Sequence, residues 1–420
     1  MTDKRTQALL QLNKCLAFLL VIWLTVPIVS QRSGLIIGMG IVALWSLTAI
    51  ALGGISLSVS KDTVCMIIWV YLAIISYVFF RRIYASYEIL YYLPMAILFF
   101  MPYYVAKFYF NRNMADFVKK LALASVVGLI VGQIFSIYYS SIVPGIMKTI
   151  EKTWDDKVTP YLKSGIGGFG FVYLTMFSAI SVIASFKGIK RVSLKIFLIF
   201  FVILSIVCLI QSTYTTAILI GIVGLLIMLI NKIKDRSVRI ILCVLIPMLL
   251  IIFANLIGTF LINLPVTGEG TNTRLREIGD LIVNGEVGIN LEGRMTHLTQ
   301  SLECFFHLPF LGSNFTTSGA YSIGTHSEWF DILGSLGIIG AIPVFATLYF
   351  KLKFINDNVK KHTGGTTYKA IIITFIIFGF LDPIIRIYHL GLAMFLVIPG
   401  ILCLNKQSQG EMLNENSLGS

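Results

Sequence analysis

The sequence predicts an all-α polytopic membrane protein of about twelve transmembrane helices, and two observations lead to this fold class. The 420 residues are 57% hydrophobic and only 13% charged, which is typical of a membrane protein and not of a soluble domain. The hydrophobic residues also gather in runs of about 20, the length that crosses a bilayer as a helix and exceeds a membrane β-strand.

Helices are expected in these runs because lipid offers the backbone no other hydrogen-bond partner. The expected spans are 14–30, 34–53, 63–80, 86–106, 117–138, 166–186, 194–211, 213–231, 239–263, 328–350, 368–382 and 387–404. Residues 1–404 therefore form one membrane domain, and the polar residues 405–420 form a cytoplasmic tail. No cleavable signal peptide is expected, because the first run lacks a small-residue cleavage site.

The lysines and arginines give the orientation. Most of them fall in segments that lie on one side when both termini are placed in the cytoplasm, as the positive-inside rule requires. This orientation puts two long loops outside, 139–165 and 264–327. The second is a large extracytoplasmic loop between spans nine and ten. Long loops with no domain of their own are usually functional.

The net charge of +13 does not predict nucleic-acid binding. The positive residues occupy short loops between spans, and no basic domain with exposed aromatic residues is present. The six cysteines form no pair with metal-ligand spacing, and most lie inside hydrophobic runs. Neither loop carries a spaced pair of aspartates, so we expect no metal and no other cofactor.

A polar insert from Arg294 onward is the part of the chain that can carry chemistry. Apolar residues at helical spacing predict a helix from Arg294 to about Phe306. Arg294 would begin this helix, where the dipole disfavours a cation, so an anion such as phosphate is the expected partner. Three further arginines on the same face either join it or are solvated surface charges: Arg274, Arg276 and Arg386. Asp382 with Arg386 can equally form a structural ion pair.

His326 is the candidate general base. The spacing of Thr325 and Glu328 predicts a capping box, which would put His326 in the first turn of span ten. The helix dipole would there favour the neutral imidazole, which can accept a proton from a hydroxyl group. The simpler interpretation is an interfacial histidine. Glu328 either only caps the helix or also orients His326 and binds sugar hydroxyls, and His297, one turn from Arg294, is a weaker candidate.

A second polar patch, Gln211 to Thr216, interrupts the hydrophobic sequence between spans seven and eight. Tyr214 and Thr215 can donate hydrogen bonds to a sugar or phosphate there, or the hydroxyl groups can simply cap span eight. The glycine-rich run from Gly165 to Gly170 has no flanking strand or lysine, so we expect close helix packing and not a phosphate loop.

The order of these elements resembles the O-antigen ligase/polymerase superfamily, and most closely its Wzy-type polymerases. The elements are Arg294 leading a helix, the turn Pro309 to Gly312, His326-Ser327, and the run Gly337 to Gly340. The resemblance covers about 50 residues closely, with the twelve-span layout and the large outer loop around them. Two departures are the missing arginine at Thr213 to Thr216 and the serine that follows His326.

The resemblance implies a GT-C-like membrane glycosyltransferase of the bacterial inner membrane, acting on its outer face. It would polymerise oligosaccharide repeat units linked to undecaprenyl diphosphate into O-antigen or capsular polysaccharide. His326 would deprotonate the acceptor hydroxyl, and arginines would hold the diphosphate. The implied partners are the lipid-linked donor and acceptor, membrane lipids, a chain-length regulator and a flippase.

Two alternatives stay open. An O-antigen ligase would use the same donor and transfer the glycan to lipid A-core. A transporter of the lipid-linked oligosaccharide is less favoured, because transporters carry charges near mid-membrane and interrupted helices in paired halves. In this sequence the spans carry few charges, and the polar residues gather at one face.

Overall fold

The computed structural model describes residues 2–53, 61–80, 83–150, 158–233, 235–263, 269–286, 288–315, 323–363, 365 and 367–404. These residues contain helices and no strand, in agreement with the predicted all-α class. The helices of the first half are α1 (Thr2–Thr25), α2 (Pro27–Ala51), α3 (Lys61–Phe80), α4 (Ile83–Asn111), α5 (Ala115–Ile142), α6 (Ile146–Thr149), η1 (Thr159–Tyr161), α7 (Phe169–Ser185), η2 (Phe186–Gly188) and α8 (Val192–Gln211).

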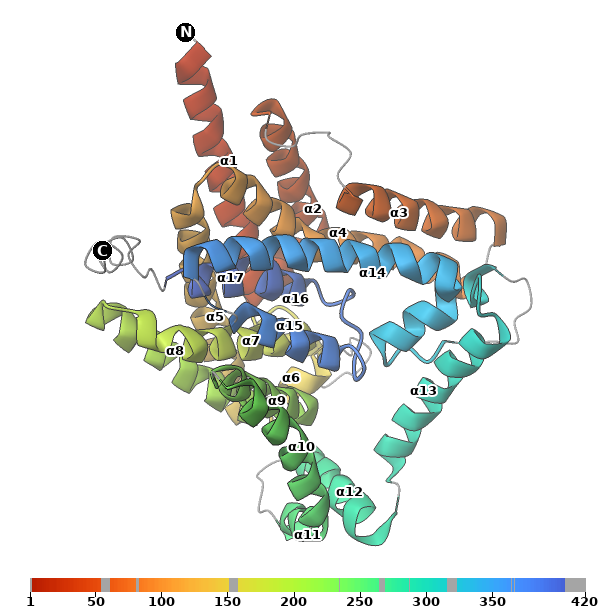
Figure 1. The fold of residues 1–420 in the computed structure, drawn as a ribbon. Helices are drawn as coiled ribbons and strands as arrows, with labels where there is room; N and C mark the ends of the chain where they lie inside the picture. The colour runs from red at the N-terminus through yellow and green to blue at the C-terminus, as the bar shows by residue number, and fades with distance from the viewer. Residues whose placement is uncertain are drawn as a thin grey trace.

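The second half contains the polar insert and the C-terminal helices (Figure 1). They are α9 (Thr215–Asn231), α10 (Arg236–Ile252), α11 (Ala254–Asn263), α12 (Glu269–Asn284), α13 (Ile289–His307), η3 (Ser313–Phe315), α14 (Glu328–Thr363), α15 (Thr367–Phe378), α16 (Tyr388–Leu392), the π-helical η4 (Ala393–Val397) and α17 (Ile398–Leu402).

Six helices of the described chain are long and apolar enough to cross a membrane: α1, α2, α5, α7 (with η2), α8 and α14. Four further apolar segments are shorter: α9, α11, α15 and Tyr388–Leu402. A polytopic membrane protein is thus the class that the helices support. The expected total of about twelve spans stays a prediction.

The C-terminal segment α16–η4–α17 lies at the centre of the molecule, where it contacts α4, α5 and α7. All residues from Leu390 to Cys403 are buried, as expected of a helix that is hydrophobic on every side. Small residues allow the close approach. A Cβ at Gly391 would lie 1.9 Å from the carbonyl oxygen of Phe99, and one at Gly400 would lie 2.4 Å from Cβ of Ala122.

The glycines between Gly165 and Gly170 also pack closely, as their sequence predicted. A Cβ at Gly170 would lie 2.5 Å from Nδ1 of His389, and one at Gly165 would lie 2.9 Å from Cβ of Ile28. Gly165 also has a φ of +88°, which side chains other than hydrogen disfavour. The run therefore positions the start of α7 against α2 and α16.

Helix α14 is broken at Gly337, which has φ +60° and ψ −171°. The turn Pro309 to Gly312 docks into this break: the backbone N–H of Ile338 donates to the carbonyl of Pro309 at 2.8 Å. The N–H of Ile339 likewise donates to Phe310 at 3.1 Å. Neither glycine at the contact tolerates a side chain, because a Cβ at Gly312 would lie 2.4 Å from the Ser335 carbonyl.

The expected span 239–263 is not one continuous helix. The chain forms α10 and α11, with a turn at Phe253 between them. Helix α11 packs against α12 across a glycine contact, where a Cβ at Gly279 would lie 2.7 Å from the carbonyl oxygen of Gly258. This close pairing of α11 with α12 turns the chain back toward α13, which a straight span would not allow (Figure 1).

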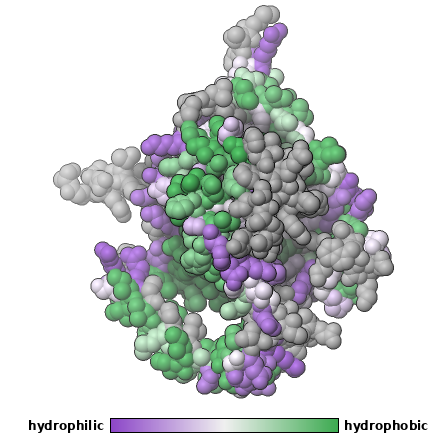
Figure 2. Space-filling model, turned by 90° about the vertical axis from the view of Figure 1, so that its right-hand side faces the viewer, coloured by the Kyte–Doolittle hydropathy of each residue, from purple (hydrophilic) through white to green (hydrophobic). Residues whose placement is uncertain are grey.

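The large insert 264–327 therefore contains two long helices where described, α12 and α13. Together with α10 and α11 they form the lower part of the molecule in Figure 1, below the main bundle. Hydrophobic and hydrophilic residues lie side by side on this lower part in Figure 2. Such mixed surfaces are typical of amphipathic helices at a membrane interface. The predicted helix 294–306 is confirmed, but it begins earlier, at Ile289.

Candidate functional site

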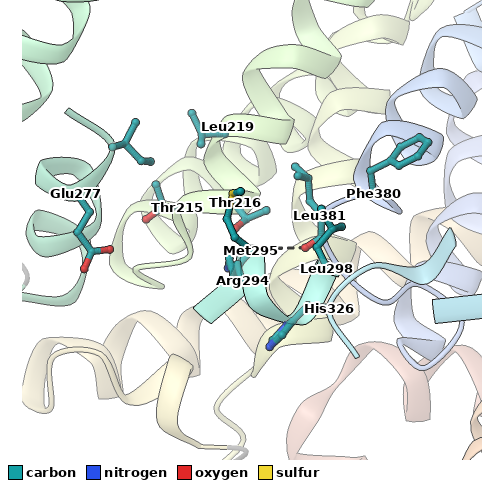
Figure 3. Close-up of a pocket in the computed structure, with 11 residues that line it drawn as sticks. Thr215, Thr216, Leu219, Glu277, Arg294, Met295, Leu298, His326, Phe380 and Leu381 are labelled. Carbon is teal, nitrogen blue, oxygen red and sulfur yellow. Dashed lines mark hydrogen bonds between the residues drawn. The ribbon is translucent and has the colours of Figure 1, made fainter. Parts of the chain in front are cut away.

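A pocket of about 330 Å³ lies where α9, α12, α13 and the chain around Phe380 meet (Figure 3). Three residues predicted from the sequence line it: Arg294, His326 and Thr215. The other lining residues are Thr216, Leu219, Glu277, Ile278, Met295, Leu298, Phe380 and Leu381. The pocket thus joins a cation, an imidazole, two hydroxyl groups and a carboxylate in an otherwise apolar wall.

Arg294 enters the pocket from the second turn of α13, and not from its first residue as expected. Its guanidinium Nη2 lies 3.9 Å from Oδ1 of Asp382, and its Nη1 donates to the carbonyl of Leu381 at 3.4 Å. The dashed line in Figure 3 marks this second contact. The side chain remains 35% exposed, whereas the Asp382 side chain is 4% exposed. The buried aspartate therefore holds one side of the guanidinium and leaves the rest free to face an anion.

Asp382 is itself fixed from the membrane bundle. Its Oδ2 accepts a hydrogen bond from the hydroxyl of Tyr173 on α7, at 3.0 Å. Tyr173 is fully buried and its ring lies 4.3 Å from that of Phe378 on α15. Arg294 is thus positioned by α7 and by the chain that follows α15, two elements that the sequence places far from it.

His326 lies in the loop that precedes α14, close to Arg294 and Leu298 in Figure 3. It is half-buried, and burial, the nearby His297 and the positive charge of Arg294 lower the pKa of its imidazole below the usual histidine range. Its ring centroid lies 4.6 Å from that of His297. The neutral form that a general base requires is therefore favoured near pH 7, as predicted, although the cause is burial and not a helix dipole.

A hydrogen-bond network fixes the loop that carries His326. The hydroxyl of Ser301 on α13 donates to Oδ1 of Asp331 on α14 at 2.6 Å and accepts from the N–H of Gly324 at 3.0 Å. The N–H of Ser327 donates to Oδ2 of Asp331 at 3.2 Å. A Cβ at Gly324 would lie 1.8 Å from the carbonyl oxygen of His297. Glycine is therefore required at this position if the loop is to lie directly on α13.

The expected capping box at Thr325 is wrong. Thr325 has a φ of +63°, and α14 begins only at Glu328. His326 consequently lies in the loop and not in the first helical turn. The physical reason is the network just described: Asp331 reaches back to the N–H of Ser327 and takes the part in capping that the sequence assigned to Glu328.

Glu328 is buried, at 3% exposure, and turns away from the pocket. Its Oε2 accepts hydrogen bonds from the backbone N–H groups of Ile384 and Ile385. This carboxylate binds the turn that follows Asp382 and so supports Arg294 indirectly. The predicted catalytic role for Glu328 has no geometric support, since it is not among the described residues that line the pocket.

The junction of α8 and α9 brings hydroxyl groups to the opposite wall. Thr213 has a φ of +57°, an uncommon conformation for a β-branched residue. Thr215 is 5% exposed, lines the pocket, and its Oγ1 has no hydrogen-bond partner among the described residues. A buried hydroxyl without a partner costs free energy, so a ligand oxygen or water is its natural partner. Tyr214 instead packs against Phe169 and donates to the carbonyl of Met147 at 3.4 Å.

None of the remaining predicted residues whose side chains are described is among those that line the pocket. His297 sits behind His326, with its Nδ1 3.2 Å from Oε1 of Gln300. Arg276 is exposed on α12. Arg386 is half-buried and lies near enough to Asp331 to act on its charge. The side chain of Arg274 lies outside the described residues.

Sequence reasoning missed two groups of site residues. Glu277 and Ile278 come from α12. This helix was not predicted because it begins with a Gly/Asn/Thr-rich stretch, which is typical of a loop. Leu381 comes from the turn after α15, as does Asp382, which the sequence offered as a partner of Arg386 and not of Arg294. A usable signal existed for α12, because Ile278, Leu281 and Ile282 recur at helical spacing. No local pattern links Asp382 to Arg294.

The arrangement can bind an anion and remove a proton beside it. Arg294 offers a guanidinium fork, Thr215 and Thr216 offer hydroxyl donors, and His326 offers a neutral imidazole within one pocket. The apolar remainder of the wall lowers the local dielectric, which strengthens such interactions. No protein-family model matches the chain, and no curated protein matches its sequence significantly, so these residues are the basis for any functional conclusion.

Proposed function

We propose that the protein is a membrane glycosyltransferase that joins oligosaccharide repeat units carried on a polyprenyl diphosphate such as undecaprenyl diphosphate. The observation that carries the proposal is the pairing of a partly exposed Arg294 with a half-buried His326 in one pocket beside membrane helices. The first group suits a diphosphate, and the second suits a sugar hydroxyl. The resemblance of the insert to Wzy-type polymerases adds to this argument.

The reaction uses these groups as follows. His326 accepts the proton of the acceptor hydroxyl, and the freed oxygen attacks the anomeric carbon of the donor sugar. The bond from that carbon to the diphosphate oxygen breaks, and the electron pair leaves with the diphosphate. Arg294 balances the charge that develops on this leaving group, with hydrogen bonds from Thr215 and Thr216. Direct displacement of this kind inverts the anomeric configuration.

The ion pair with Asp382 holds the guanidinium of Arg294 in position at the edge of the pocket. At 3.9 Å the ion pair is long, so a diphosphate that binds Arg294 can share the guanidinium without first breaking a short contact. Tyr173 and Glu328 keep the aspartate and its turn in place. The buried framework thus prepares the cation for an anion on its exposed side.

We prefer a polymerase to a ligase because the segment His326-Ser327-Glu328-Trp329 and its surroundings resemble the Wzy-type polymerases most closely. Both enzymes would bind the same donor and use the same base, so the acceptor separates them. Such an enzyme would act on the outer face of the bacterial inner membrane, in the orientation that the basic residues favour.

Glycan profiling in the host tests the proposal. A strain that lacks the gene is complemented with wild type, His326→Ala or Arg294→Ala, and the surface glycans are separated by size while the protein level in membranes is measured. His307→Ala and Arg191→Ala serve as matched controls, because both residues are exposed and neither lines the pocket.

We expect single-repeat glycans in the two site variants and full-length polymer in the two controls, at equal protein levels. Long lipid-linked chains that never reach their final carrier would assign the protein as a ligase. Full-length surface polymer from His326→Ala would reject the assignment of this histidine as the base.

A further inference from the structure

A second and larger groove, of about 690 Å³, lies between α14 and α15. Its walls are apolar and aromatic, and its polar residues gather at one end. The residues that line it are Trp329, Phe330, Leu333, Phe345, Leu348, Tyr349, Leu352, Lys353, Asn356, Asp357, Lys369, Ile372, Ile376 and Phe380. The proposed glycosyl transfer makes no use of this groove.

Contacts around Trp329 hold α14 and α15 together at one end of the groove. The ring of Trp329 lies against Gly379, where a Cβ would be 2.4 Å from the indole, and its Nε1 donates to the carbonyl of Ile376 at 2.8 Å. The hydroxyl of Ser327 donates to the carbonyl of Gly379 at 3.3 Å. Beyond this junction the two helices make few contacts and leave the groove open between them.

The opposite end of the groove is positively charged. Lys353 on α14 and Lys369 on α15 both line it and are exposed, beside a single carboxylate, Asp357. The ammonium group of Lys353 lies 5.9 Å from the ring centre of Tyr349, so its stem follows the apolar wall while its charge reaches outward. The orientation favoured by the basic residues puts this end at the cytoplasmic surface.

We propose that this groove binds an anionic glycerophospholipid of the inner leaflet. Its acyl chain would lie along Leu352, Leu348 and Ile372, and its phosphate would lie between Lys353 and Lys369. An apolar channel that ends in two lysines at the membrane surface matches the chemistry of such a lipid, which has a hydrocarbon chain below an anionic head. A zwitterionic lipid would gain less from the same lysines.

The groove does not suit the diphosphate of the donor. Phe380 lines both the groove and the pocket of Arg294, so the two cavities adjoin at the fastened end. The lysines lie at the other end: Lys353 follows Phe345, whose ring lies 5.8 Å from that of Trp329, by about two helical turns. A headgroup held by Lys353 therefore lies away from the end that adjoins the pocket of His326, and the bound lipid would be a resident component and not a substrate.

Lipid binding to the full-length protein tests this inference without reference to enzymatic activity. Wild type and a Lys353→Gln/Lys369→Gln variant are placed in nanodiscs of phosphatidylethanolamine that contain increasing phosphatidylglycerol. The lipid retained after transfer to mild detergent is then counted by native mass spectrometry. The control is Lys360→Gln/Lys361→Gln, which removes two exposed lysines from the last turn of the same helix, outside the groove.

We expect wild type and the control to retain phosphatidylglycerol in preference to phosphatidylethanolamine. The groove variant should bind it about 25-fold more weakly, since each lysine near the surface contributes about fivefold. Equal retention by the two double variants, or no preference for the anionic lipid in wild type, would overturn the proposal.

Discussion

Two of the ion pairs in the described part of the chain, Lys351–Asp62 and Arg294–Asp382, join segments distant in sequence and differ in how far their cations are exposed. Lys351 on α14 is fully buried, with Nζ 3.3 Å from Oδ2 of Asp62 on α3 and 3.0 Å from the hydroxyl of Tyr104. Arg294 keeps 35% of its side chain exposed and lies 3.9 Å from Asp382. The first cation has its partners inside the protein, whereas the second has room for one more.

This difference separates a structural charge from a functional one. The ammonium group of Lys351 lies over the rings of Phe100, Tyr103 and Tyr104, at 5.4, 4.2 and 4.4 Å from their centres. None of the Lys351 side chain is exposed, so it offers no surface to an anion from solvent. A charge that a membrane protein buries so completely must be compensated in place, whereas a charge at the edge of a pocket can change partners.

The largest effect is expected at the buried pair. Lys351→Met removes the fully buried cation beside Asp62, which keeps Lys107 at 3.6 Å and the hydroxyl of Tyr103 at 3.1 Å. The free energy of unfolding should fall by about 3 kcal/mol, as when one member of a buried pair is removed. Unfolding in detergent, followed by circular dichroism, measures it.

The double variant Lys351→Met/Asp62→Asn is the control for this experiment, because it removes the uncompensated charge and should recover most of the loss. A single variant as stable as wild type would show that Lys351 does not hold α3 to α14.

The exposed pair should behave in the opposite way. Arg294→Ala should lower the rate of glycan polymerisation by about 100-fold or more, since one donor to a developing anion contributes about that much. The guanidinium is 35% exposed and lies 3.9 Å from Asp382, so we expect Arg294→Ala to lower the free energy of unfolding less than Lys351→Met does, although Asp382 itself is buried. A large loss of stability with normal polymer length would place Arg294 in the same structural class as Lys351.

Tyr173→Phe should give an intermediate effect and tests how Arg294 is positioned. The variant removes the hydrogen bond to Asp382 but keeps the ring in the core. A loss of about 1 kcal/mol in transition-state binding, or about fivefold in rate, is expected for one hydrogen bond. Rates measured in membranes over a range of donor concentrations should show whether kcat falls while KM is kept. An unchanged rate would mean that Asp382 is held without Tyr173.

The smallest change concerns pH. The lowered pKa of His326 means that its imidazole stays neutral, and active as a base, to a pH below the usual histidine range. As pH falls through that pKa, the ring takes up a proton and the rate declines. Arg294→Gln removes a nearby positive charge and should raise the pKa, so the acidic limb of the rate profile moves to higher pH. A limb that stays in place would assign the titration to another group.

Hydrophobic runs and their spacing predicted the all-α class and a helix from Arg294 to about Phe306, which lies inside α13. The polar segments between the runs predicted three residues of the pocket. The sequence did not predict three features: the break at Gly337, the turn at Phe253 and the ion pair of Arg294 with Asp382. Each depends on a contact between segments distant in sequence, whereas periodicity reports only local surroundings. The capping box failed for the same reason, because Asp331 and Ser301 fix the loop through tertiary hydrogen bonds.

The docking of the Pro309 turn into α14 has a consequence for how the protein is made. The N–H groups of Ile338 and Ile339 find their acceptors in the insert and not in their own helix. Until the insert folds back, these two groups have no partner at membrane depth, where lipid can supply none. Insertion of this helix and folding of the insert onto it should therefore be coupled during biogenesis, and the loop that carries His326 should be set in place as they complete.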